Sequence, residues 1–135
     1  MAGYSGTPLV RKLGINEGFR AALLNSPPGF TKELEGLPVE LADTPRKPMD
    51  FLLLFVKSRR ELKQSFPRCA AKLAPSGMLW IAWPKKASGV TTDLNENIVR
   101  DIGLKEGLVD VKICAINDVW SGLKFVIRLK DRPRV

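Results

Sequence analysis

Two short segments of the chain combine basic and hydroxyl side chains in a way that suits an anionic ligand. The first is Lys57 to Arg60 (KSRR), and the second is Lys85 to Asp93 (KKASGVTTD). Ammonium and guanidinium groups attract anions, and hydroxyl groups donate hydrogen bonds to phosphate or carboxylate oxygens. We therefore predict an anion-binding site, whose candidate residues are Lys57, Ser58, Arg59, Lys85, Lys86, Ser88, Thr91 and Thr92.

Both segments stand between an apolar strand and a helix. Residues 51–56 and 78–83 are continuous apolar runs, typical of central strands in a parallel sheet. Ser58 and Glu61 match a capping box, and Thr92 or Asp93 suits the start of the next helix. Parallel strands end at one edge of a sheet, and helix N-termini there favour anions. With a third strand ending at residues 24–26, we expect these segments to lie side by side.

The same residues admit other roles. Ser58 and Thr92 could act only as helix caps, with the lysines fully solvated. Lys85 beside Lys86 could have a lowered pKa and act as a nucleophile or base, and Ser88 could pair with Lys85 in a Ser-Lys dyad. Asp93 could be a base, or it could compensate the dipole of a helix start.

The composition is that of a soluble globular protein with an excess of basic residues. The chain has 135 residues, of which 44% are hydrophobic and 27% charged, with a formal net charge of +8. This length predicts one α/β domain over residues 1–135. The positive charge favours anionic partners, although a basic surface can also serve solubility alone.

The residue types exclude several kinds of chemistry. The chain has no histidine, and its two cysteines, Cys69 and Cys114, each fall in an apolar pattern. We therefore predict buried reduced thiols, no metal, no cofactor, and no Ser-His or Cys-His catalysis. The N-terminus does not resemble a signal peptide, and the apolar runs are too short for a bilayer. These features predict a cytoplasmic location without membrane contact.

The order of elements predicts a Rossmann-like α/β fold. We expect a mostly parallel sheet with helices on both faces and a C-terminal antiparallel hairpin. Trp80 and Trp83 should face opposite sides of their strand, while Trp120, in the hairpin turn, could cover the site, a partner surface or the core. In the N-terminal part we also expect a helix from Thr7 (N-cap) and Pro8 to Gly14, a strand at 19–24, a turn at 25–30, one helical turn at 31–34 and a weak strand at 39–42. A helix should cover residues 58–73, kinked or split by Pro67 and stopped by residues 74–77. It should be followed by a helix from 92 or 93 to 102, strands at 109–116 and 123–129, and a frayed tail at 130–135.

Residues 50–129 resemble the C-terminal half of a class I methyltransferase domain. The strand at 51–56, the following helix, the turn LAPSG at 73–77 and the strand at 78–83 are similar to its fourth strand, helix and fifth strand. The terminal hairpin is similar to its sixth and seventh strands. Where that family has a glycine-rich loop after the first strand, this chain has Asn25 to Gly29 (NSPPG), with a single glycine. Asp43 falls where an acidic ribose ligand would be expected.

The whole chain also resembles a family of short bacterial proteins of about this size, classed as a domain of unknown function. The shared segments are residues 3–10 (GYSGTPLV), 83–89 (WPKKASG) with 92–94 (TDL), and 119–123 (VWSGL). This resemblance implies a fold and a cytoplasmic location but no activity.

Three classes of function fit these features. We first predict a non-enzymatic α/β module that binds an anionic small molecule or a protein partner at the basic segments. The second possibility is a degenerate methyltransferase-like enzyme acting on a phosphorylated or nucleotide substrate, with Lys85, Lys86 and Ser88 at its centre. The third is a nucleic-acid-binding protein, and only Trp120 and the basic run at 57–60 support this class.

Overall fold

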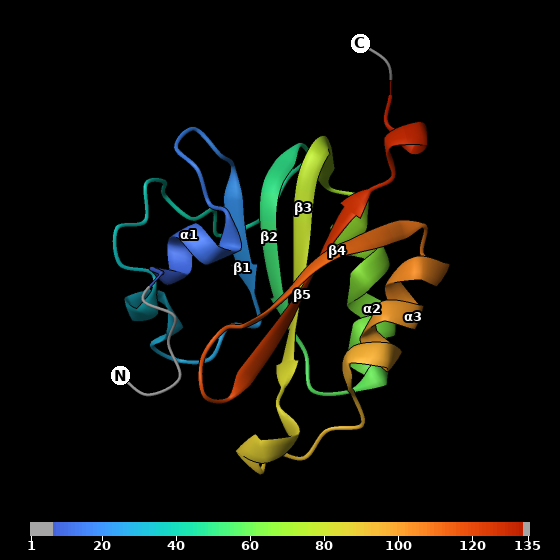
Figure 1. The fold of residues 1–135 in the computed structure, drawn as a ribbon. Coiled ribbons are helices and arrows are strands. Elements are labelled where there is room, and N and C mark those ends of the chain that lie inside the picture. The colour runs from blue at the N-terminus through green and yellow to red at the C-terminus, as the bar shows by residue number, and fades with distance from the viewer. Residues whose placement is uncertain (1–6, 134–135) are drawn as a thin grey trace.

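The computed structural model describes residues 7–133, which form a mixed five-stranded sheet (Figure 1). The strand order is β1-β2-β3-β5-β4, with β1, β2 and β3 parallel and β5 antiparallel to both β3 and β4. The strands are β1 (Ala21–Leu24), β2 (Met49–Phe55), β3 (Leu73–Pro84), β4 (Leu108–Ala115) and β5 (Trp120–Ile127). The predicted Rossmann-like sheet with its C-terminal hairpin is confirmed.

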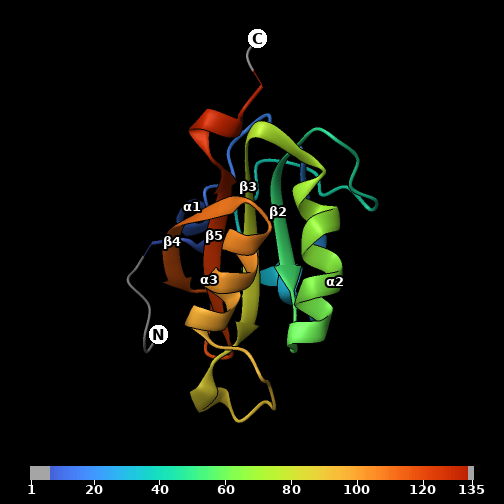
Figure 2. The ribbon, with the colours of Figure 1, turned by 90° about the vertical axis from the view of Figure 1, so that its right-hand side faces the viewer.

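Helices cover both faces of the sheet (Figure 2). On one face, α2 (Arg59–Ala70) and α3 (Glu96–Lys105) enclose a core that includes Trp83. On the other, α1 (Leu9–Leu13) and the 3-10 turn η1 (Phe30–Glu33) enclose a core that includes Trp80. The two tryptophans therefore face opposite sides, as predicted. Each helix of residues 7–133 falls short of the length and apolarity that a bilayer crossing needs.

The centre of the sheet follows directly from the sequence. β2 lies between β1 and β3, and its residues from Phe51 to Phe55 are all buried, as expected of a continuous apolar strand. Ser58 caps α2 as predicted, because its Oγ accepts from Glu61 N at 3.1 Å. Glu61 Oε1 accepts from Lys57 N at 3.0 Å, so the return contact of the capping box is shifted to the residue before the N-cap.

The N-terminal third differs from prediction in two places. Pro8, not Thr7, is the N-cap of α1, and its carbonyl accepts from Arg11 N and Lys12 N at 3.0 Å. Gly14 ends the helix at φ 82°, as predicted. The predicted strand at 39–42 is reduced to a single parallel bridge between Leu41 and Ala21. Residues 3–6 of the motif GYSGTPLV lie outside the described residues.

The boundary between α2 and β3 also differs. α2 runs unbroken through Pro67, which lies exposed in its last turn and does not split it. Residues 74–77 do not stop a helix but belong to β3, whose first residue, Leu73, pairs with Met49. A Cβ at Gly77 would lie 2.5 Å from the Met49 carbonyl oxygen, so this pairing requires glycine.

The C-terminal hairpin forms as predicted, with a shifted start. β5 begins at Trp120, which is 7% exposed and packs edge-on against Phe55 with ring centroids 5.0 Å apart. Trp120 is therefore a core residue and not a cover over the site. Asn117 Oδ1 closes the turn by accepting from Val119 N and Trp120 N, both at 2.9 Å. Where a frayed tail was predicted, residues Leu129–Asp131 form a 3-10 turn, η3.

Candidate functional site

A pocket of about 760 Å³ opens beside the carboxyl end of β3. Most of its lining comes from the loop that leaves β3 at Pro84, forms the 3-10 turn η2 (Lys86–Ser88) and enters α3. Figure 1 shows this loop in its lower part. Its walls come from the start of α2, the loop, the first turn of α3, and the β4–β5 ribbon. The lining residues are Arg59, Trp83, Lys85, Lys86, Gly89, Val90, Thr91, Thr92, Asp93, Leu94, Asn95, Glu96, Ile98, Ile113 and Ser121.

The two basic segments are neighbours, as the parallel strand order requires. Thr92 Oγ1 donates to the Lys57 carbonyl oxygen at 2.6 Å. Asp93 Oδ1 accepts from Arg59 N at 2.8 Å, and the Asp93 carbonyl oxygen accepts from Arg59 Nε at 3.3 Å. The loop after β3 is thus attached to the first turn of α2.

The eight predicted site residues divide into two groups. Five of them line the pocket: Arg59, Lys85, Lys86, Thr91 and Thr92. Three do not and hold the backbone instead. Lys57 presents its carbonyl to Thr92, and Ser58 caps α2.

Ser88, the third of these, makes only local contacts. Its Oγ donates to the carbonyl oxygen of Lys85 at 2.6 Å and accepts from Val90 N at 3.2 Å. The hydroxyl is therefore engaged by the backbone of its own turn. This arrangement gives no support to a Ser-Lys dyad.

The sequence predicted Thr92 or Asp93 as the N-cap of α3, but neither residue caps that helix. The N-cap of α3 is Asn95, whose Oδ1 accepts from Ile98 N at 2.9 Å. Asp93 serves the N-terminus of α2 instead, where its carboxylate takes the place that we expected for an external anion. The ligand-facing charge must therefore come from side chains and not from the α2 backbone.

The acidic residues of the pocket already have partners. Glu96 forms an ion pair with Arg100 at 2.6 Å, and Asp93 approaches the Arg59 guanidinium at 4.0 Å. The hydrogen bonds that Arg100 donates to Glu96, and then to Asp110, raise the pKa of its guanidinium group. Within residues 7–133, Lys85 and Lys86 have no carboxylate within ion-pair distance. Two lysines that line the pocket are therefore without an acidic partner in the part of the chain that the structure describes.

Sequence reasoning missed the apolar and hairpin side of the pocket. Ile98 comes from α3, while Ile113 and Ser121 come from β4 and β5. No local pattern marks Ile113 or Ser121, because their place in the pocket depends on the long-range strand order β3-β5-β4. Among the described residues, no three Cys, Asp or Glu side chains gather in a way that could hold a metal ion.

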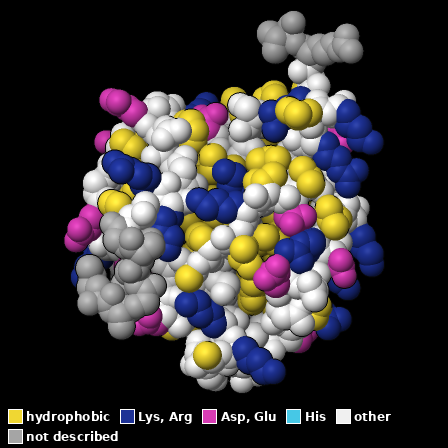
Figure 3. Space-filling view, in the orientation of Figure 1, with side chains coloured by type: hydrophobic (Ala, Val, Ile, Leu, Met, Phe, Trp, Pro, Cys, Tyr) yellow, Lys and Arg dark blue, Asp and Glu magenta, His cyan; other side chains and the backbone are white. Residues whose placement is uncertain are grey.

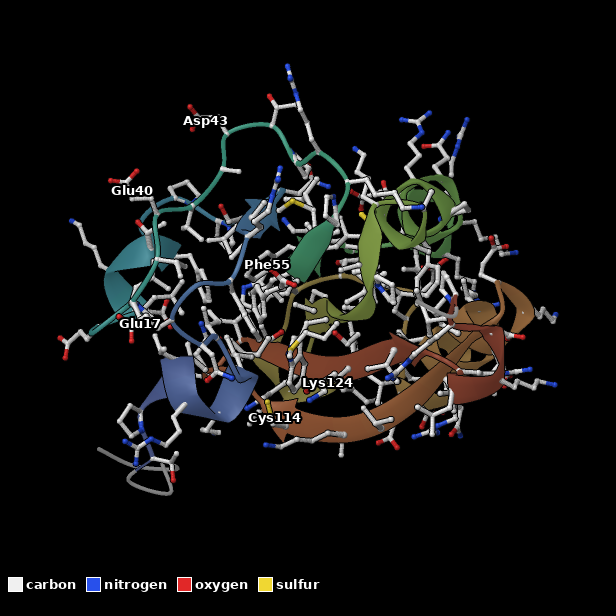
Figure 4. All side chains as sticks on the ribbon, turned by 90° about the horizontal axis from the view of Figure 1, so that it is seen from above. Glu17, Glu40, Asp43, Phe55, Cys114 and Lys124 are labelled. Atoms are coloured by element: carbon white, nitrogen blue, oxygen red, sulfur yellow. The ribbon has the colours of Figure 1, made fainter. Side chains whose placement is uncertain are left out.

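The loop after β1 leads into a buried aromatic residue, Phe30. Phe30 is 2% exposed and packs against Phe55 with ring centroids 4.9 Å apart. Asn25, at φ 57°, donates to the Phe55 carbonyl oxygen at 3.4 Å. Asp43 lies on an outer loop with its carboxylate directed away from the sheet (Figure 4).

Comparison with known proteins establishes the fold. No family model matches the sequence, and no curated protein does. A magnesium protoporphyrin IX methyltransferase from Synechocystis PCC 6803, solved with bound SAM, superposes with a TM-score of 0.59 at 12% identity, covering 89% of this chain and 74% of that one. A ribosomal protein methylase from Lactobacillus delbrueckii subsp. bulgaricus gives 0.58 at 10% identity, covering 89% and 75%. The chain has a methyltransferase-like fold.

A methyltransferase from Pyrococcus furiosus is similar at a TM-score of 0.51 and 10% identity, covering 87% of this chain and 78% of that one. The resemblance of residues 50–129 to a methyltransferase domain is thus confirmed for the fold. The resemblance to the family of short bacterial proteins stays a prediction.

Proposed function

We propose that the protein is a methyltransferase-like domain that binds an anionic small molecule, such as a phosphorylated metabolite or nucleotide, in the pocket at the end of β3. The observation that carries this proposal is the pair Lys85 and Lys86, which line the pocket and have no carboxylate within ion-pair distance among residues 7–133. The pocket's acidic residues, Asp93 and Glu96, pair with arginines instead.

The loop is built to hold these lysines in place. Lys85 N donates to the Val119 carbonyl oxygen at 2.7 Å, and Ser88 N donates to the Lys85 carbonyl oxygen at 3.0 Å. The exposed Thr91 hydroxyl adds a donor on the same wall. Because the backbone is fixed before binding, little conformational entropy is lost when an anion forms charge-assisted hydrogen bonds there.

Isothermal titration with inorganic phosphate and with adenosine monophosphate tests the proposal. We expect Lys85→Ala/Lys86→Ala to weaken binding at least about tenfold, or about 1.4 kcal/mol. The matched control Lys32→Ala/Lys63→Ala removes the same charge from exposed positions outside the pocket lining and should leave the affinity within about twofold. An equal loss of binding affinity in both variants would reject a specific site at Lys85 and Lys86.

The fold comparisons favour a second candidate over a purely binding role. Solved methyltransferases share this fold, and one of them carries bound SAM, which supports a methyltransferase-like enzyme acting on a nucleotide or phosphorylated substrate. Against it stands the loop after β1, which has one glycine and a buried Phe30. A melting temperature raised by S-adenosylmethionine would support the enzyme, and an unchanged one would support the binding domain.

Nucleic-acid binding has less support from the structure. Trp120 was the candidate for stacking on bases, and it is buried in the core. Single-stranded DNA tested at increasing salt separates this class, because phosphate-backbone binding weakens steeply as salt rises. DNA binding in low salt that is unchanged in the variant Lys85→Ala/Lys86→Ala would indicate general charge attraction.

A further inference from the structure

One side of the pocket is apolar. Trp83 and Leu94, 5% and 7% exposed, belong to the core under α2 and α3, so this side continues that core into the pocket. Ile98, half-buried on α3, extends it. Ile113 is 47% exposed at the pocket wall. An exposed isoleucine in the lining of the same pocket as a core tryptophan is apolar surface that a bound molecule can remove from water.

The strand register places the sheet residues of this apolar side on the face that α2 and α3 cover. Trp83 pairs with Ser121 across β3 and β5, and Ser121 pairs with Ala115 across β5 and β4. Ile113 lies two residues before Ala115 and pairs with Leu123, which is part of the core under α2 and α3. Since side chains alternate along a strand, Trp83, Ser121 and Ile113 share one face of the sheet. Three hydrogen-bonded strands thus support this wall.

The basic and the apolar parts of the pocket have different origins. Lys85 and Lys86 come from the loop beyond the end of β3, whereas Ile113 lies within β4. In Figure 3, hydrophobic side chains lie over the middle of the view, and Lys and Arg side chains lie among them as well as near its lower end. A pocket of about 760 Å³ exceeds the needs of a bare anion and falls within the range of about 300–1,000 Å³ that small-molecule sites occupy.

Resting on the proposed function, we infer that the ligand is amphipathic: an anionic head held at Lys85 and Lys86, joined to an aryl or alkyl body that covers Ile113 on the apolar side of the pocket. A bare phosphate would leave Ile113 in water. Covering this side chain adds binding free energy in proportion to the apolar area removed from water. The ligand class is therefore aryl or alkyl phosphates and carboxylates.

Titration calorimetry at pH 8 with inorganic phosphate, phenyl phosphate and hexyl phosphate tests this inference. All three carry about two negative charges at that pH, so their electrostatic attraction is matched. We expect the two esters to bind at least about tenfold more tightly than inorganic phosphate, the gain from burying about two methylene groups. Ile113→Ser should cut the ratio of hexyl phosphate to inorganic phosphate affinity at least about threefold.

The matched control is Val111→Ser, since Val111 is 51% exposed on the same strand but outside the pocket lining. It should leave the affinity ratio unchanged, and circular dichroism should confirm the fold of both variants. Equal affinities for the three phosphates, each lost in Lys85→Ala/Lys86→Ala, would overturn the amphipathic ligand and leave the proposed function intact. Failure of all three to bind in a Lys85- and Lys86-dependent way would overturn the proposed function and this inference with it.

Discussion

At the scale of single residues, side chains near the site mostly hold the backbone of a neighbouring element. Asp93 is the clearest case, because its carboxylate accepts a hydrogen bond from the first residue of α2, thirty-four positions away in sequence. The sequence predicted a role at a helix start but placed it on the wrong helix. A local pattern shows that an aspartate can cap; only the fold decides which amide it reaches.

Replacing Asp93 tests this contact. We expect Asp93→Ala to lower the free energy of unfolding by about 1 kcal/mol, as for the loss of other N-terminal helix contacts. Asp43→Ala, which changes an exposed aspartate in an outer loop, should stay within about 0.5 kcal/mol of the parent. Chemical denaturation measures both, and equal stabilities of the two variants would reject the role of Asp93.

Cys69 gives the stability a dependence on alkaline pH. Burial raises the pKa of its thiol from an ordinary value of 9.0 to about 11, with nearby Lys72 opposing the shift. The unfolded chain therefore loses this proton first, and stability present below pH 9 is lost as the pH rises towards 11. We expect a decrease on the order of 2 kcal/mol that Cys69→Ala lacks. Denaturation between pH 8 and pH 11, roughly the window of the linkage, measures the difference.

At the scale of elements, the loop from Lys85 to Asn95 decides the site. Its conformation depends on Thr92, whose hydroxyl donates to the Lys57 carbonyl oxygen and accepts from Leu94 N at 3.1 Å. These contacts tie the loop to α2 and shape the pocket wall between them.

Thr92→Val keeps the shape of the side chain and removes both hydrogen bonds. We expect amide hydrogen exchange in residues 89–95 to become faster, because the loop then opens more often. Thr91→Val is the matched control, since Thr91 is exposed and lines the same pocket. Unchanged exchange in Thr92→Val would show that the loop is held by other contacts.

The elements also show how far sequence reasoning reaches. The apolar strand β2, the Ser58 cap of α2 and the antiparallel hairpin carry local signals and were predicted. The first part of β3 was not, because Leu73 pairs with Met49 from a distant segment and Gly77 fits under the Met49 carbonyl. The basic wall of the pocket was predicted from parallel strand ends, whereas Ile113 and Ser121 were missed because they depend on the pairing of β3 with β5.

At the scale of the whole molecule, the sheet connects two cores. Trp83 belongs to one and Trp80 to the other, and both come from β3. The backbone of a single strand therefore links the two hydrophobic layers, which is the arrangement expected of one domain.

The prediction of one domain implies that the chain unfolds in one cooperative transition. Calorimetric and van't Hoff enthalpies should agree, and fluorescence and far-ultraviolet circular dichroism should give coincident curves. Two separate transitions would contradict one domain over the chain and would mean that the two layers fold independently.

The location of the ligand can be measured directly by titrating isotope-labelled protein with inorganic phosphate and following the backbone amide shifts. A site at the end of β3 predicts that the largest changes lie in residues 85–96, with smaller ones at Arg59 and Ser121. Changes centred on residues 25–30 after β1, or scattered evenly over the surface lysines, would contradict it.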